Sequence, residues 1–348
     1  MAEHGTSIEL DTMSEYLKVH IEDFGQLEEI EKFSGGQSNP TYKLTSSSGQ
    51  YVLRAKPPGE LLKSAHQVDR EYRVMKALGD TEVPVPKMMH LSDETENPLG
   101  RTFFVMEYLD GEIYWDPALS ELDETNNAGR GVIYNAMNDA LAKLHSVNPS
   151  SIGLEDFGVP GNYFARQLSR WTKQYLASET DSNENMNSLI HWLEENMPND
   201  DGQVSLVHGD YRLDNMVFDK SGSTILGILD WELSTLGHPL ADLAYQCMQW
   251  RLPNAGSFRG LAGVDRAARG IPTEKQYVSA YCKRRNIEEI ENWSFYVAFS
   301  FFRLAAILQG VYKRSLDGNA SNPKKAKLYG AAVPVLSEMA ISMIREEN

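Results

Sequence analysis

The chain has 348 residues, a formal net charge of −16 and a pI near 5.0, with 41% hydrophobic and 24% charged residues. This length suits one large domain or two lobes with a cleft between them, and this composition is typical of a folded globular protein. A duplex-binding surface needs concentrated Lys and Arg, and no run of them is long enough, so nucleic acid is excluded as a partner.

The first part of the chain, residues 1–110, mixes helical and strand-like patterns. Leu10, Met13 and Leu17 fall on one face of a first predicted helix. Alternation in "TYKLTS" and "QYVLRAK" predicts two strands joined by a turn, and the apolar run "TFFVMEYLDG" predicts a buried strand. Between them, "LLKSAHQVDREYRVMKALG" has helical spacing. We predict a small sheet with one or two helices, forming an N-terminal nucleotide-binding lobe.

Residues 111–348 are mainly helical by the same criteria and would form a C-terminal catalytic and substrate-binding lobe. Its amphipathic stretches include "RGVIYNAMNDALAKLHSV", "YFARQLSRWTKQYLA" and "LADLAYQCMQW". The exception is a predicted hairpin, in which "NMVFD" and "TILGILD" are joined by "KSGS". The Gly- and Arg-containing segment 251–272 is long enough to be a lid or binding loop.

Three features bear on the compartment and on membranes. The two cysteines, Cys247 and Cys282, show neither metal-ligand spacing nor a disulfide framework, which fits a reducing compartment. The start of the chain is polar and acidic and does not resemble a signal peptide. The apolar stretch "YVAFSFFRLAAILQGVY" contains Arg303 and favours a buried core helix over a membrane span. We expect a cytoplasmic monomer or homodimer without a membrane partner.

The stretch "LVHGDYRLDNMVFD" concentrates polar residues between two apolar runs. Asp210 and Asn215 have the spacing of the kinase catalytic pattern D-x-x-x-x-N, and Asp230 follows at the far end of the hairpin. Phosphoryl transfer needs a carboxylate beside the attacking hydroxyl and oxygen ligands that hold Mg²⁺ on the phosphates. We interpret Asp210 as the first, and Asn215 with Asp230 as the second.

The N-terminal part supplies matching candidates for ATP binding. In "FSGGQSNPTYKL", small residues just before a strand could let backbone N–H groups approach the phosphates; these residues are Ser34, Gly35, Gly36 and Ser38. Arg54 lies on a strand where a cation would reach the phosphates, and Glu71 on the next helix could pair with it. The backbone at Glu107 and Leu109, in "VMEYL", could bind adenine. A plain tight turn and an ordinary surface ion pair are the alternative readings of the glycines and of Arg54 with Glu71.

Together these motifs resemble the aminoglycoside phosphotransferase and choline kinase family, which is related to protein kinases. "FSGGQSNPTY", "LVHGDYRLDN" and "DWELSTLGHPLADLAY" are most similar to the kinase-like domains related to acyl-CoA dehydrogenases. The resemblance covers residues 10–330 and implies a two-lobed, protein-kinase-like α+β fold. It also implies that Asp210 is the catalytic base, that Asn215 and Asp230 hold Mg²⁺, and that Glu232 assists them.

The resemblance further implies that His208 and Asp242 support the catalytic loop without touching substrate. The chain departs from the protein-kinase pattern at "HGD" and "DWE", and arginine replaces the usual lysine at position 54. Arginine binds phosphate with a different fork geometry, so Lys56 on the same strand is an alternative phosphate contact.

Other polar and aromatic residues have simpler structural interpretations. His145 and His238 are expected to be structural, and Asp214 is expected to point to solvent or to the loop backbone. Four aromatic residues are expected in the core: Trp231, Trp250, Phe299 and Phe302. A basic helix face could bind an anionic substrate, or could simply be solvated; its residues are Arg166, Arg170 and Lys173.

The predicted function is ATP- and Mg²⁺-dependent phosphorylation of a hydroxyl group on a small molecule. The resemblance favours a metabolic alcohol or a hydroxyacyl compound over an aminoglycoside, and the candidate lid carries Arg259, Arg266 and Arg269 instead of a concentrated acidic surface. A nucleotide-binding pseudokinase that acts as a regulatory module is the main alternative, and a magnesium-dependent hydrolase is the other.

Overall fold

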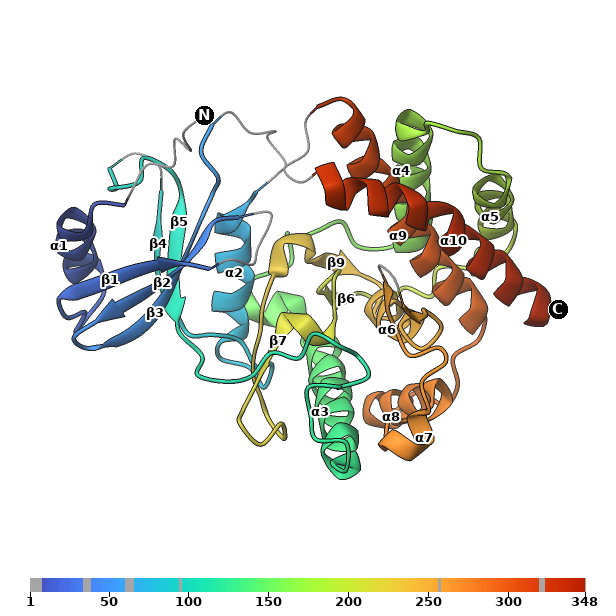
Figure 1. Cartoon of the computed structure of the whole chain (residues 1–348), viewed down its shortest axis with the longest axis horizontal. Coiled ribbons are helices and arrows are strands. Elements are labelled where there is room, and N and C mark those ends of the chain that lie inside the picture. The colour runs from blue at the N-terminus through green and yellow to red at the C-terminus, as the bar shows by residue number, and fades with distance from the viewer. Residues whose placement is uncertain are drawn as a thin grey trace.

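The computed structural model describes residues 8–33, 39–59, 66–93, 96–255, 258–318 and 323–347. It shows the two-lobed α+β, kinase-like arrangement that the sequence predicts, with a small sheet on one side and a larger helical part on the other (Figure 1). The expected division at residue 110 stays a prediction, although the last strand of the small lobe ends just before it.

The small lobe is built on a five-stranded antiparallel sheet with the order β1-β2-β3-β5-β4. Its strands are β1 (Leu27–Lys32), β2 (Thr41–Ser46), β3 (Gly49–Ala55), β4 (Met88–Ser92) and β5 (Phe103–Glu107). The predicted strands at β2, β3 and β5 are confirmed. Three consecutive residues of β3, Tyr51, Val52 and Leu53, are buried, which places this strand inside the lobe with packing on both faces of the sheet.

Two helices accompany this sheet. Helix α1 (Leu10–His20) buries Met13 and Leu17 against its outer part, and α2 (Val68–Leu78) covers the side that faces the larger lobe (Figure 1). The predicted second helix is confirmed from Val68 onward, and the part of its pattern at 61–65 lies outside the described residues. His66 has φ +60°, a left-handed conformation that does not belong to an α-helix, so α2 starts only after it.

The larger lobe contains three short two-stranded sheets and most of the helices. The predicted hairpin is confirmed as β7 (Met216–Phe218) and β8 (Ile225–Ile228), and β6 (Ser205–Val207) pairs with β9 (Thr235–Gly237). A further pair, β10 (Asn254–Ala255) and β11 (Phe258–Arg259), lies in the candidate lid. The helices are α3 (Asn127–Ser146), α4 (Tyr163–Ser178), α5 (Glu184–Glu195), α6 (Leu240–Met248), α7 (Arg266–Arg269), α8 (Glu274–Arg285), α9 (Trp293–Leu316) and α10 (Pro323–Glu347).

Helix α9 is the central helix of this lobe and contacts α4, α5, α6 and α10. Two stretches, Trp293–Leu316 and Ala326–Glu346, are long and apolar enough to cross a membrane by length and composition, and 72% of the first is buried inside the protein. The expectation of a buried core helix around Arg303 is thus confirmed. The four aromatic residues expected in the core are also buried: Trp231, Trp250, Phe299 and Phe302.

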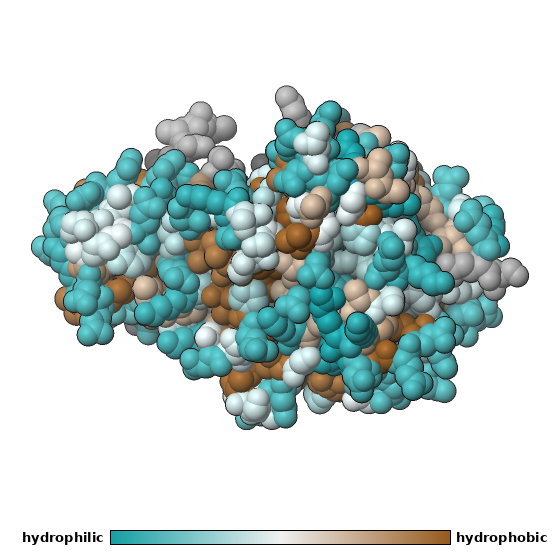
Figure 2. Space-filling model, turned by 90° about the horizontal axis from the view of Figure 1, so that it is seen from below, coloured by the Kyte–Doolittle hydropathy of each residue, from teal (hydrophilic) through white to brown (hydrophobic). Residues whose placement is uncertain are grey.

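The surface seen from below is mainly hydrophilic, with small groups of hydrophobic residues near its middle (Figure 2).

The chain segment that connects the lobes packs very closely against β7. A Cβ on Gly111 would lie 2.2 Å from the carbonyl oxygen of Phe218, and the following Glu112 exchanges backbone hydrogen bonds of 2.8 Å with Phe218. Only glycine allows this approach, which ties the connector after β5 to β7, directly beyond the catalytic loop.

Candidate active site

A buried carboxylate fixes the backbone of the catalytic loop. Asp242, at the start of α6, accepts hydrogen bonds from the backbone N–H groups of His208 (2.7 Å) and Gly209 (2.8 Å). Burial on its own raises the pKa of Asp242, but hydrogen bonding from His145 and from the loop backbone lowers it overall. His145 lies 3.3 Å from Asp242 and 2.7 Å from the hydroxyl of Tyr281. The structure therefore gives Asp242 and His145 the positions expected of structural residues.

The His208 side chain completes this support. Its Nδ1 accepts the backbone N–H of Asp210 at 3.2 Å, and its Nε2 lies 2.9 Å from the carbonyl oxygen of Leu229, next to the candidate metal ligand Asp230. One tautomer, with the proton on Nε2, satisfies both contacts. His208 thus connects the loop that carries Asp210 to the segment after β8 that carries Asp230.

Gly209 is the second position where only glycine fits. Its φ is +85°, and a Cβ there would lie 2.6 Å from the carbonyl oxygen of Leu233. Its own carbonyl oxygen accepts a hydrogen bond of 2.9 Å from the buried guanidinium of Arg303 on α9. The central helix of the large lobe, α9, therefore stabilises the catalytic loop through this hydrogen bond.

The carboxylate of Asp210 is held by two neutral donors. The Tyr245 hydroxyl donates to Oδ1 at 2.8 Å, and the Asn215 amide donates to Oδ2 at 3.1 Å. Arg212 adds positive charge, because its Nε lies 3.7 Å from Oδ1 and its guanidinium is also paired with Asp214. The expectation that Asp214 points to solvent or to the loop backbone is therefore wrong: the Arg212 side chain attracts it.

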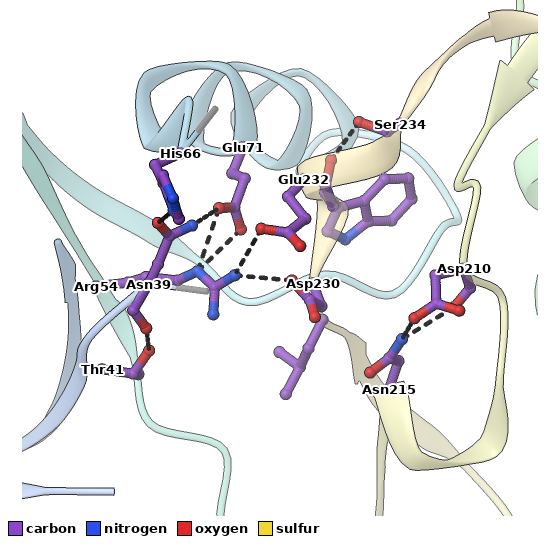
Figure 3. A network of polar contacts seen from close by, with 12 residues as sticks. Asn39, Thr41, Arg54, His66, Glu71, Asp210, Asn215, Asp230, Glu232 and Ser234 are labelled. Atoms are coloured by element: carbon purple, nitrogen blue, oxygen red, sulfur yellow. Dashed lines mark hydrogen bonds and ion pairs between the residues drawn. The ribbon is translucent and has the colours of Figure 1, made fainter. Parts of the chain in front are cut away.

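A second cluster faces this one from the small lobe (Figure 3). Arg54 on β3 makes an ion pair with Glu71 on α2 at 3.0 Å, and its other end lies 2.7 Å from Oδ1 of Asp230 and 4.0 Å from Glu232. Asp230 has φ +64°, an unusual conformation for a residue with a side chain, which is often found at functional sites. The cluster thus joins both lobes through one guanidinium.

The pair of Arg54 and Glu71 is not an ordinary surface ion pair. The Glu71 side chain is only 1% exposed and also accepts a hydrogen bond of 3.0 Å from Asn39. Burial on its own lowers the pKa of Arg54, but the three surrounding carboxylates raise it overall. For Glu71, burial is the main cause that raises the pKa to about 7, and the two nearby carboxylates add to it against the opposing effect of the cation.

This pKa leads to a pH-dependent stability. The pKa of Glu71 is 4.5 in the unfolded chain and about 7 in the folded protein. Protonation of Glu71 therefore contributes fully to the free energy of unfolding below pH 4.5, and this contribution is lost as the pH rises through 7. Between about pH 5 and 8, the free energy of unfolding of the wild type should fall by on the order of 2 kcal/mol relative to Glu71→Gln, whose side chain stays neutral. Urea denaturation of both proteins at these two pH values measures this difference; parallel pH profiles would contradict it.

The donor set at Asp230 fits magnesium. Asn215 and Asp230 offer an amide and a carboxylate oxygen, Glu232 lies beside them, and the backbone N–H of Leu229 donates to Asn215 at 2.8 Å, which keeps the two segments adjacent. Mg²⁺ commonly takes one or two carboxylates plus substrate phosphates, and no thiol or imidazole is required. In the described ranges, no three His, Cys, Asp or Glu side chains converge as a preformed metal cage. When bound, Mg²⁺ would neutralise phosphate charge.

Other predicted site residues have different outcomes. Ser34, Gly35, Gly36 and Ser38 lie outside the described residues. The backbone N–H of Glu107 donates to the carbonyl of Lys87 within the small lobe, and the Leu109 side chain packs against Gly227 in β8 of the large lobe. Their contact with adenine stays a prediction.

Lys56 lies just beyond β3, where its backbone N–H binds Thr102, whereas Arg54 points into the cluster of carboxylates (Figure 3). This geometry favours Arg54 over Lys56 as the phosphate contact.

The arginines of the candidate lid do not form a free basic surface. Arg259, Arg266 and Arg269 each donate to a backbone carbonyl, those of Trp115, Leu261 and Ala118 respectively. They stabilise the segment and its contact with the loop that follows the lobe connector. The preference for another acceptor over an aminoglycoside, to which these arginines contributed, stays a prediction.

Sequence reasoning missed Arg212 and Tyr245 as neighbours of Asp210. A signal existed for Tyr245, because it follows Asp242 by three residues and so lies on the same face of α6. Since Asp242 is expected to face the catalytic loop, Tyr245 should face it too. The contact of Arg303 with Gly209 has no comparable signal, because it depends on how α9 crosses the loop.

Tyr245→Phe should lower kcat about tenfold with little change in the KM for ATP, since one hydrogen bond to the carboxylate of Asp210 is lost while the ring is kept. Tyr211→Phe is the matched control, because that hydroxyl donates to the carbonyl oxygen of Met137 and not to Asp210. Steady-state kinetics of the two variants checks the assignment. Equal effects on kcat would indicate a general packing defect.

The fold and the two facing clusters define a kinase-like phosphotransferase. The model of the phosphotransferase enzyme family matches residues 29–274, and the chain therefore belongs to this family. Curated relatives include acyl-CoA dehydrogenase family member 10 of Mus musculus (44% identical, 98% of this chain, 32% of the relative). Acyl-CoA dehydrogenase family member 11 of Homo sapiens is 40% identical over 95% of this chain and 42% of its own length. The chain thus spans about a third to two fifths of these relatives.

Solved structures agree with the fold. A Ralstonia eutropha protein, provisionally described as an aminoglycoside phosphotransferase, is 44% identical with a TM-score of 0.87, covering 98% of this chain and 99% of that one. Spectinomycin phosphotransferase in complex with ADP and spectinomycin has a TM-score of 0.63 at 14% identity, covering 97% and 98%. At that identity the likeness shows the fold alone. The predicted resemblance to this family is confirmed.

Proposed function

We propose that this chain transfers the γ-phosphoryl group of ATP to a hydroxyl group of a small molecule, a metabolic alcohol or a hydroxyacyl compound. The observation that carries the proposal is the orientation of the Asp210 carboxylate, which Tyr245 and Asn215 hold near the Arg54 cluster (Figure 3). A base on one side and a cation on the other are what phosphoryl transfer requires.

In the proposed reaction, Asp210 orients the acceptor hydroxyl and takes its proton. Arg54, braced by Glu71, is released from Asp230 toward the phosphates, and Asn215 and Asp230 would hold Mg²⁺. Spectinomycin phosphotransferase binds ADP in a similar fold, which supports ATP as the phosphoryl donor here.

The acceptor class is inferred from the relatives. Those with 40–44% identity are named acyl-CoA dehydrogenase family members, and this chain matches only 32–42% of their length. These names favour a hydroxyacyl compound over an aminoglycoside. The pseudokinase alternative retains nucleotide binding but predicts no turnover.

ADP release with ATP and Mg²⁺ should be measured against aminoglycosides, choline-like alcohols, sugars and hydroxyacyl-CoA thioesters. Release stimulated by a hydroxyacyl compound, with a matching phosphorylated product in the mass spectrum, is the expected result. ATP binding without stimulation by any acceptor would favour the pseudokinase, and the absence of ATP binding would refute both.

A further inference from the structure

Helix α4 carries a row of cations with no acidic partner. Arg166, Arg170 and Lys173 follow one another at intervals of four and three residues and so share one face, and the helix contains no Asp or Glu. Arg170 and Lys173 are exposed and Arg166 is partly exposed. Within the described ranges, none of the three makes an ion pair. We call these three residues the basic stripe.

The stripe is unusual for this chain. Like charges three or four residues apart on a helix repel each other, and the chain as a whole has a net charge of −16, so carboxylates for pairing are plentiful elsewhere. A shallow hollow runs along the stripe, lined by Ala165, Arg166, Ser169, Arg170 and Lys173. An anion placed there would meet three cations and the Ser169 hydroxyl.

Helix α4 is fixed relative to the catalytic loop. The Arg303 guanidinium, which donates to the carbonyl oxygen of Gly209, lies 6.0 Å from the ring of Trp171 on α4. The Arg170 guanidinium lies 5.2 Å from the same ring. A residue of the basic stripe and the residue that supports the loop therefore both contact Trp171.

A continuous path of contacts also leads along the surface from the loop to the stripe. The carbonyl oxygen of Leu233 packs closely against Gly209. Two residues later, the side chain of Thr235 packs just as closely against Gly158. The next residue, Val159, receives a hydrogen bond from Arg166 on its carbonyl oxygen. Leu233 is 45% exposed and Val159 63% exposed, so apolar surface lies between the catalytic loop and the stripe.

We propose that the basic stripe binds the phosphate groups of an acceptor whose hydroxyl lies at Asp210 and whose acyl chain and pantetheine arm cross Leu233 and Val159. From position 166 to 173 the stripe extends about 10 Å along the helix, enough for more than one phosphate. The acceptor class is a hydroxyacyl thioester of coenzyme A, which combines a hydroxyl, an acyl chain and a phosphorylated carrier. This inference rests on the proposed function and adds the part of the acceptor that is recognised.

The test compares one hydroxybutyryl group on two carriers, coenzyme A and pantetheine, with the hydroxyl at the second, third or fourth carbon. Pantetheine keeps the thioester and lacks the phosphates. The wild type should use the coenzyme A thioester with a KM about tenfold lower, and this advantage should shrink with added salt. In R170E/K173E, the KM for the coenzyme A thioester should rise about tenfold with kcat unchanged, and the KM for the pantetheine thioester should stay the same.

The matched control is K275E/K283E on α8, which makes the same charge change on exposed residues at the opposite end of the lobe (Figure 1). It should leave both KM values unchanged. Equal use of the two thioesters by the wild type, or equal effects of the two double variants, would overturn the stripe proposal while leaving the proposed function intact. Absence of turnover with both thioesters would contradict the acceptor class itself.

A binding measurement separates these cases further. Calorimetry with coenzyme A itself, on protein saturated with ADP and Mg²⁺ to occupy the nucleotide site, should show binding that R170E/K173E weakens about tenfold and K275E/K283E does not. Equal binding of coenzyme A by the wild type and R170E/K173E would overturn the proposal independently of catalysis.

Discussion

Asp210→Asn is expected to lower kcat by about 10³-fold while ATP affinity stays within about twofold of the wild type. The substitution keeps the size of the side chain and an oxygen for the Tyr245 hydroxyl, but removes the basic oxygen that takes the proton from the acceptor. Asp210 is set apart from the Arg54 cluster, which holds the candidate phosphate contacts (Figure 3). Pre-steady-state and steady-state kinetics with the best acceptor, together with ATP titration, measure both quantities.

The control for this variant is Asp214→Asn. It lies on the same loop, carries the same charge and is paired with Arg212, which also lies near Asp210, but neither Tyr245 nor Asn215 is shown donating to it. It should change kcat by only a few fold. If Asp210→Asn kept more than about a tenth of the wild-type kcat, the role of general base would have to be given up, although the family membership would stand.

The sequence predicts best those residues whose roles follow from their spacing along the chain. Asp210 and Asn215 are five residues apart on one loop, and their side chains meet in the structure as expected. Arg54 and Glu71 lie on a strand and on the following helix, and the short connection makes their meeting predictable. Their catalytic roles remain predictions, but their positions agree with those roles.

The misses share a different cause. His66 lies within the helical pattern of the sequence, but it takes a left-handed conformation and binds Asn39. Strand β9 has only three residues, too few for any periodicity to show. The pairing of Arg212 with Asp214 also depends on how the loop folds back on itself. Each of these features is decided by the packing of segments distant in the chain or by a single turn.

The polar support of the loop suggests how the site keeps its geometry. Arg303, His208 and Asp242 all bind backbone groups of the loop, so that Asp210 is positioned without any of them touching its carboxylate. Positioning by buried polar groups costs free energy unless every partner is satisfied. The network is therefore the part of the site where one substitution should affect stability most.

Asp242→Asn is expected to lower the free energy of unfolding by about 3 kcal/mol and to reduce kcat as a consequence. The side chain is 1% exposed and its two oxygens accept the N–H groups of His208 and Gly209, so one N–H would face the new amide NH₂. Leaving a buried donor unsatisfied and losing charge-assisted hydrogen bonds each cost about 1–3 kcal/mol. Urea denaturation measures the loss at neutral pH.

Asp201→Asn is the matched control, since that carboxylate also contacts a histidine, His238, but its side chain is 46% exposed. Water can replace its contacts, so its loss should be under about 1 kcal/mol. If Asp242→Asn were as mild as Asp201→Asn, the loop would have to be held mainly by Arg303 through Gly209, and Arg303→Met would then produce the larger loss. The two variants together therefore decide whether α6 or α9 supports the catalytic loop.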